Sequence, residues 1–120
     1  MSIADNLAVV ERLIKQACQA ASRPRSDVTL VAVSKGHDFF ALQTAYNCGQ
    51  RHFGESYAQE MAQKMMMAHE HGLHDITWHF IGAIQSNKLK TIIQAQLIHS
   101  LASLKHAALL NQATQKPVKV

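Results

Sequence analysis

The sequence predicts an α/β fold in which parallel strands alternate with helices, preceded by one N-terminal helix. Short runs of β-branched and aromatic residues are separated by amphipathic stretches, and each strand–helix unit is near the length of a βα repeat. Glycine or polar residues follow each predicted strand. This rhythm is typical of a parallel sheet with right-handed crossovers. With 120 residues, the chain forms one domain at most, over residues 1–120.

Composition and charge narrow the class of protein. Hydrophobic residues make up 48% of the chain and charged residues 17%, which indicates a globular protein rather than a disordered one. The net charge of +4 is unevenly spread, because residues 76–120 carry lysines and no acidic residue. Such a region can bind nucleic acid. No aromatic residues interleave with these lysines, so a solvated helix face is favoured and no nucleic-acid partner is expected. The lysines are Lys88, Lys90, Lys105, Lys116 and Lys119.

The two cysteines and the hydropathy pattern indicate a cellular location. Cys18 and Cys48 lie far apart and form no CxxC motif, so a reducing compartment is expected. No apolar run approaches the length of a membrane span, and the N-terminus lacks the pattern of a signal peptide. These features predict a cytoplasmic protein without a membrane partner.

The first helix is predicted over residues 3–21. Ile3, Leu7, Val10 and Ile14 recur at steps of three and four residues, together with Ala17 and Ala21, and draw one apolar stripe. Ser2 or Asp5 could cap its start, and the segment 22–24, which ends in proline, stops it.

The first strand, Val28–Ser34, is the stretch around which the chain is organised. Its continuous apolar run predicts a strand buried on both faces. Lysine fits poorly inside such a strand, so Lys35 is expected where the strand leaves the core. Parallel α/β sheets place their ligands at this position.

The remaining elements follow in strict alternation. A helix over 38–48 precedes a short strand over 51–54, and Ser56 to Gln59 matches a capping box for the next helix, which ends near Gly72. The third strand is predicted over Ile76–Gly82 and the next helix over 86–94. A short strand over 97–100, a helix over 101–115 and the beginning of a fifth strand over 117–120 complete the chain.

If the strands are parallel, the polar residues that follow them share one edge of the sheet. The four groups are Lys35-Gly36, Gly54 to Ser56, Gly82 to Asn87, and His99-Ser100. A partly desolvated lysine there can act as a neutral amine and form a Schiff base with a carbonyl. Helix N-termini at the same edge favour anions such as phosphate. The alternative is that Lys35 is an ordinary surface lysine at a strand end.

Two histidine patterns are weaker. His69 to His74 does not match H-E-x-x-H, because Leu73 occupies the second histidine position, so a solvated helix end is favoured over a zinc site. His79 should point to one face of the sheet, where it is either a hydrogen-bonded core residue or a functional one. Motifs for phosphate-cradling loops and for serine hydrolases are not found in the sequence.

Three stretches together resemble the pyridoxal phosphate homeostasis protein family. They are Val31-Ala-Val-Ser-Lys35, Phe53-Gly-Glu-Ser-Tyr57 with Gln59-Glu60, and Trp78-His-Phe-Ile-Gly-Ala-Ile-Gln-Ser-Asn-Lys88. The third is the most specific, and the order and spacing of all three agree with the family. The similarity runs from about residue 3 to the end of the chain.

The resemblance implies a (β/α)8 TIM-type barrel like the N-terminal domain of alanine racemase. It implies that pyridoxal 5′-phosphate (PLP) is held as a Schiff base on Lys35, with Asn87, Gly54 and Ser56 at the pocket rim. Family members are PLP carriers or regulators of vitamin B6 pools without an established reaction. A racemase-like enzyme is the alternative, and it would need a second acid/base group such as a tyrosine.

The chain departs from the family pattern in residues and in length. His37, in Gly36-His37-Asp38, replaces a second basic side chain near the cofactor, and Ser56 stands where the family usually has asparagine. Family members are roughly twice this length, and their main phosphate-binding residues lie in the C-terminal half. The chain is therefore expected to form a partial barrel. It is either a fragment or truncated product, or one of two copies that complete each other's barrel by self-association. An inactive truncated fragment that does not retain PLP is a further alternative to a PLP-binding protein.

Overall fold

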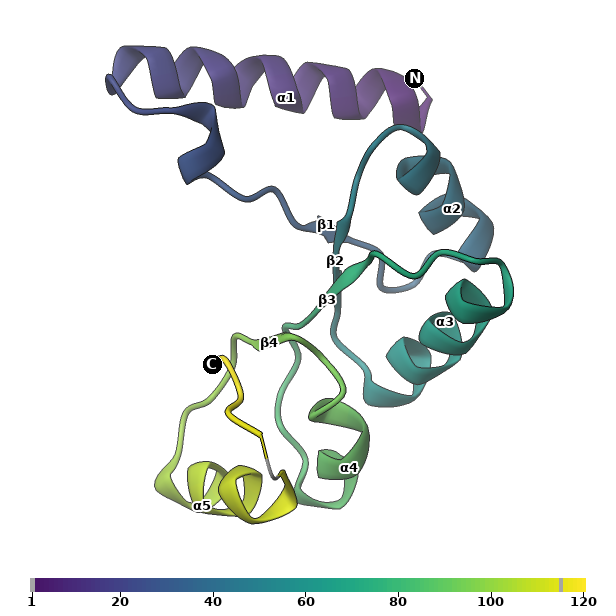
Figure 1. Cartoon of the computed structure of the whole chain (residues 1–120), viewed down its shortest axis with the longest axis vertical. Helices are drawn as coiled ribbons and strands as arrows, with labels where there is room; N and C mark the ends of the chain where they lie inside the picture. Colours follow the sequence, from purple (N-terminus) through teal and green to yellow (C-terminus); the bar gives the residue numbers. More distant parts are fainter. Residues whose placement is uncertain (1, 115) are drawn as a thin grey trace.

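The computed structural model describes residues 2–114 and 116–120. Four parallel strands form one sheet in the order β1-β2-β3-β4, and helices connect successive strands (Figure 1). This arrangement confirms the predicted α/β fold with an N-terminal helix. The elements are α1 (Ile3–Ala20), β1 (Ala32–Val33), α2 (Phe39–Asn47), β2 (His52–Glu55), α3 (Ala58–Glu70), β3 (Thr77–Phe80), α4 (Leu89–Ile92), β4 (Leu97–Ile98) and α5 (Leu104–Ala113).

Helix α1 begins with a reciprocal cap. The Asp5 N–H donates to Ser2 Oγ at 3.1 Å and the Ser2 N–H donates to Asp5 Oδ2 at 3.3 Å, so two free backbone donors are satisfied at once. Ile3 and Leu7 pack against the core and Ile14 is half-buried, whereas Val10 is 37% exposed. The predicted apolar stripe is thus covered only in part.

Strand β1 is shorter and less buried than predicted. Only Ala32–Val33 forms a strand, and Val33 is 49% exposed, so a strand over Val28–Ser34 buried on both faces was wrong. The described sheet pairs β1 with β2 alone, which leaves the β1 backbone without a ladder partner on its other side. An edge strand of this kind is easily shortened. Its second face also lacks the cover that a closed sheet would give it.

The predicted capping box at Ser56 is also wrong. Helix α3 begins at Ala58 after Tyr57, and no side chain caps it. Ser56 instead lies against the chain that leaves β3: a Cβ added to Gly82 would come within 1.8 Å of the Ser56 carbonyl oxygen. Ser56 therefore lies where the chain leaving β2 contacts the chain leaving β3, and not in the first turn of α3.

The last third of the chain follows the predicted order with shifted boundaries. A 3-10 turn over Ser86–Lys88 precedes the short α4, so the predicted helix over 86–94 is only partly α-helical. Helix α5 starts at Leu104 because the Ser103 hydroxyl accepts the His106 N–H at 3.1 Å. Its predicted end at residue 115 lies outside the described residues. Lys119 forms a parallel bridge to Leu97, which supports the beginning of a fifth strand.

The hydrophobic core lies between the helices and one face of the sheet. Phe53 of β2 and Phe80 of β3 alternate with residues that point to the opposite face, and each is 1% exposed. Leu42 of α2, Met61 of α3 and Ile92 of α4 close over them. Within the described residues, no helix has both the length and the hydrophobicity to cross a membrane.

Candidate functional site

The strand exits meet at one edge of the sheet, as the parallel pairing requires. The Ser34 N–H donates to the Gly54 carbonyl at 3.0 Å, and the Ile81 N–H donates to the Glu55 carbonyl at 2.9 Å. The His99 N–H donates to the Phe80 carbonyl at 2.9 Å. These bonds join the residues that follow β1, β3 and β4 to the last residues of β2 and β3. The chain therefore turns from strand to helix at a common edge, where parallel α/β sheets bind ligands.

Lys35 lies in the turn that follows β1 and is exposed. Its neighbour Ser34 is buried, and Gly36 adopts a φ of 76°, which is the left-handed region that favours glycine. Among the described residues, no hydrogen bond or ion pair engages the Lys35 amine.

The other predicted rim residues have different surroundings. Gly54 is buried, and a Cβ there would lie 3.1 Å from Val31 Cγ1 and 3.3 Å from Ile81 Cδ1. Ser56 is half-buried beside Gly82, and Asn87 is exposed on the 3-10 turn before α4. No described hydrogen bond joins any of these three residues to Lys35. The structure thus brings the backbone segments to one edge without linking the side chains.

A buried polar cluster beneath Lys35 was not predicted. Lys64 of α3 donates to the Ser34 carbonyl at 2.5 Å, to Glu55 Oε1 at 2.8 Å and to Glu60 Oε1 at 2.9 Å. The Ser34 hydroxyl donates to Glu55 Oε1 at 2.5 Å. A signal was present in the sequence, because Lys64 falls on the apolar face of the helix, between Met61 and Ala68. Only the folded chain shows what surrounds it.

Glu60 extends this cluster to the other side of Lys35. Its Oε1 accepts the Gly36 N–H at 2.7 Å. The hydrogen bond from Lys64 lowers the pKa of Glu60, and the Gly36 N–H and the charges of Lys64 and His37 act in the same direction, while partial burial opposes them. Glu60 is therefore a carboxylate at neutral pH, and it accepts charge-assisted hydrogen bonds.

Three histidines form a hydrogen-bonded row across neighbouring strands. His52 Nδ1 lies 3.0 Å from His79 Nε2, and His79 Nδ1 lies 2.9 Å from His99 Nε2. Burial lowers the pKa of His79, which is 5% exposed, and the nearby His52 and His99 lower it further. The structure shows the burial and the hydrogen bonds expected of a core histidine at His79. Among the described residues, no group of three or more His, Cys, Asp or Glu side chains is arranged to hold a metal ion.

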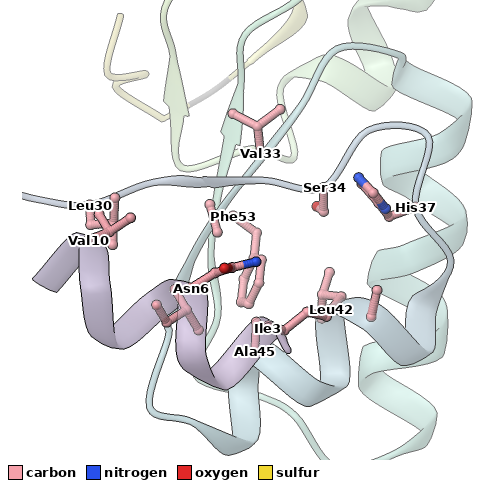
Figure 2. A pocket seen from close by; sticks show the side chains of 13 residues that line it. Ile3, Asn6, Val10, Leu30, Val33, Ser34, His37, Leu42, Ala45 and Phe53 are labelled. Carbon is pink, nitrogen blue, oxygen red and sulfur yellow. The ribbon is translucent and has the colours of Figure 1, made fainter. Parts of the chain in front are cut away.

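A separate cavity of about 370 Å³ lies between α1, α2 and the β1 segment (Figure 2). Figure 2 shows Ser34 and Val33 pointing to opposite sides of the chain, with Val33 directed away from α1. The lining is largely apolar, with Leu30, Leu42 and Phe53 among its members, and none of the residues that line it is Lys or Arg. His37 is the one basic side chain in this lining and the other residues are mostly apolar, so the cavity is poorly matched to an anionic cofactor.

Comparison with known proteins shows which proteins this chain resembles. No model of a protein family matches the sequence. The pyridoxal phosphate homeostasis proteins of Schizosaccharomyces pombe and Escherichia coli are 41% and 38% identical to the chain. The alignments cover 90% and 98% of this chain but 46% and 50% of those proteins. The chain spans about half the length of the curated relatives that it matches.

Solved structures agree with the sequence comparison. PipY from Synechococcus elongatus, solved with PLP bound, matches with a TM-score of 0.70 and 37% identity over 83% of this chain and 47% of that one. A protein from Bifidobacterium adolescentis matches with a TM-score of 0.79 and 27% identity over 92% of this chain and 48% of that one.

The fold and the strand-end lysine define a class of protein: a parallel α/β barrel, present here as about half of its length, with an amine at a strand exit. Within this class, the chain belongs to the pyridoxal phosphate homeostasis protein family. The resemblance noted in the three sequence stretches is thereby confirmed.

Proposed function

We propose that this chain holds PLP through a Schiff base on Lys35 and serves PLP homeostasis without catalysing a reaction. The observation that carries the proposal is the position of Lys35, exposed at the carboxyl end of β1 with no described partner for its amine. PLP supplies an aldehyde, and a lysine amine is the group that condenses with it. The similarity to a PipY structure with PLP bound supports the same choice of ligand.

The remaining rim residues have supporting roles in this proposal. Asn87 and Ser56 are polar residues at neighbouring strand exits and can donate hydrogen bonds to the cofactor. Gly54 would act indirectly, since it allows Val31 and Ile81 to pack over the strand. His37 is exposed two residues after Lys35 and supplies an imidazole near the same edge.

Reduction of the protein–PLP mixture with borohydride tests the assignment of Lys35. We expect a visible absorption band on mixing and, after reduction, a covalent PLP adduct on the peptide that contains Lys35. Lys35→Ala should abolish both. The exposed Lys90 serves as the matched control, and Lys90→Ala should leave both unchanged. An adduct that persists in Lys35→Ala would remove Lys35 from this role.

The length of the chain makes retention of PLP a separate question from adduct formation. The resemblance assigns the main phosphate-binding residues to the half that lies outside this sequence, so the alternative of a fragment that does not retain PLP is tested in the same experiment. An adduct trapped by immediate reduction, but lost when the protein is desalted before reduction, would show that the amine is present and the phosphate site incomplete. An adduct that survives desalting would contradict the fragment alternative.

The racemase-like alternative finds little support in the surroundings of the tyrosines. The Tyr46 hydroxyl donates to Asp75 and the Arg51 guanidinium lies 3.7 Å from the centre of its ring. The hydrogen bond to Asp75 raises the pKa of Tyr46, so this hydroxyl is occupied away from the rim. Tyr57 is 64% exposed at the start of α3. Exchange of the α-hydrogen of alanine in deuterated buffer with PLP present would favour the enzyme instead.

The proposed location is the cytoplasm. Cys18 and Cys48 are both free, which is the expected state in a reducing compartment. The lysines of residues 76–120 remain assigned to a solvated surface, and PLP is the only partner proposed besides a second copy of the chain.

A further inference from the structure

The backbone on both sides of Lys35 is held by one helix. The carbonyl of Ser34, just before Lys35, accepts a hydrogen bond from Lys64 Nζ at 2.5 Å. The N–H of Gly36, just after Lys35, donates to Glu60 Oε1 at 2.7 Å. Lys64 and Glu60 lie one turn apart on α3 and are paired at 2.9 Å. The three-residue segment 34–36 is therefore held at both ends by a single ion pair.

The ion pair lies deeper than a surface salt bridge. The side chain of Lys64 is 5% exposed, that of Glu55 is 0% exposed and that of Glu60 is 27% exposed. An ammonium group has three donors, and here they meet three acceptors: Ser34 O, Glu55 Oε1 and Glu60 Oε1. Pairing of all three ammonium donors makes the buried charge of Lys64 tolerable and gives it one preferred geometry, although the buried Glu55 Oε2 has no hydrogen-bond partner among the described residues.

Packing alone does not require a lysine at this position. The neighbours of Lys64 on the buried face of α3 are the apolar Met61 and Ala68, and apolar side chains of similar volume commonly replace buried ion pairs without loss of stability. What an apolar side chain cannot do is bind a carbonyl and orient a carboxylate at the same time. Both of these contacts converge on the turn that carries Lys35.

We propose that Lys64 and Glu60 are positioning residues that hold the 34–36 turn and so present the Lys35 amine at the sheet edge. This inference rests on the proposed function, since it concerns the presentation of the same lysine. Lys64 has its own amine fully engaged and buried, so it does not substitute for Lys35 as the group that reacts with an aldehyde.

Two measurements separate this role from a general effect on folding. Backbone amide hydrogen exchange of Gly36 reports the turn in the absence of any cofactor. Borohydride trapping with pyridoxal, the aldehyde without the phosphate, reports how well the Lys35 amine is presented, independently of any phosphate site. Thermal unfolding followed by circular dichroism monitors the overall fold in parallel.

Glu60→Ala is the primary variant, because Glu60 lies at the partly exposed end of the cluster. We expect Gly36 exchange to accelerate about tenfold, as for loss of one hydrogen bond to a charged group, and pyridoxal trapping at Lys35 to fall by a similar factor. Glu60→Gln keeps the acceptor oxygen and should restore most of both. The exposed neighbour Gln59 provides the control, and Gln59→Ala should change neither. Lys64→Met, if it folds, should reproduce the Glu60→Ala result.

Unchanged Gly36 exchange and unchanged trapping in folded Glu60→Ala would overturn the inference while leaving the proposed function intact. Conversely, failure of the wild-type chain to form any adduct on Lys35 would defeat the proposed function. The exchange of Gly36 would still decide whether Glu60 holds the turn. If Lys64→Met does not fold, Glu60→Ala alone decides the outcome.

Discussion

A few residues at the ends of the strands fix the backbone around the candidate site. Lys35 is exposed, yet Ser34 immediately before it is 6% exposed and bonded to Glu55 and Lys64. The side chain of Lys35 is thus exposed to solvent while the backbone beside it is held. Gly82 allows the chain leaving β3 to touch the backbone of Ser56, which brings two exits to the same place.

Substituting Gly82 and Gly54 should distinguish a glycine that is needed for a close backbone contact from one that only contacts side chains. A Cβ at Gly82 would meet the Ser56 carbonyl oxygen at 1.8 Å, whereas one at Gly54 would meet only side-chain carbons at 3.1 and 3.3 Å. We expect Gly82→Ala to lower the free energy of unfolding by about 3 kcal/mol or more, and Gly54→Ala by about 1 kcal/mol. Urea denaturation measures both. Equal losses in the two variants would contradict the close crossing.

At the scale of elements, helix α3 and strands β2 and β3 supply the polar side chains that gather around the sheet. Helix α3 supplies Lys64 and Glu60 to the β1 turn, although its remaining buried positions are apolar. Strands β2 and β3 contribute His52 and His79 to the row of histidines, and His99 follows β4 directly. On the side of the sheet that the helices cover, the buried side chains are apolar apart from the Lys64 cluster. The row of histidines crosses neighbouring strands.

The histidine row should make the stability of the chain depend on pH. Because burial lowers the pKa of His79, the unfolded chain binds a proton on this residue more readily than the folded chain does. The stabilisation that neutral His79 gives the folded chain is fully present above the ordinary histidine pKa of about 6.5. It is lost as the pH falls through the lower pKa that His79 has in the folded chain. We expect the free energy of unfolding to decrease as the pH is lowered from about 7.5 to about 5.5, which is about one unit on either side of the ordinary histidine pKa. Urea denaturation at each pH measures it.

Removal of the titrating group tests the origin of this fall. His79→Gln should flatten the pH dependence, whereas His74→Gln, which replaces an exposed histidine, should retain it. A fall of the same size in His79→Gln and in the wild type would assign the effect to other groups.

The whole molecule is open on one side. Its radius of gyration is 15.7 Å, compared with roughly 13.5 Å for a compact chain of this length. The edge of β1 has no partner strand in the described sheet, and Val33 is 49% exposed beside it. Since the chain spans about half the length of its relatives, this open side corresponds to the place where the rest of a barrel would close.

An uncovered sheet edge and an exposed apolar face favour pairing between copies. We expect the chain to self-associate, with a mass of at least a dimer by light scattering at concentrations of tens of micromolar, a typical range for such contacts. Val33→Lys places a charge on the exposed face and should shift the mass toward the monomer. Met66 is exposed on helix α3 and is not part of the sheet, so Met66→Lys should leave the mass unchanged. A wild-type chain that is monomeric at every concentration would contradict self-association.

The sequence by itself determined the order of the elements, the strand-end position of Lys35 and the family. Apolar periodicity, caps and strand composition act over a few residues, so they can be recognised in any short window. The same reasoning failed at β1 and at Ser56, because the length of an edge strand and the path of a strand exit depend on neighbours distant in sequence.

Only the tertiary structure decided how Lys35 is held. Glu60 lies 24 positions after Gly36 and Lys64 lies 30 positions after Ser34, and the row of His52, His79 and His99 spans three strands. No local pattern encodes these contacts, because they form only when parallel pairing brings separate βα units into register. The position of Lys35 at a strand end is thus a local property of the chain, whereas the contacts that hold its turn form only in the assembled sheet.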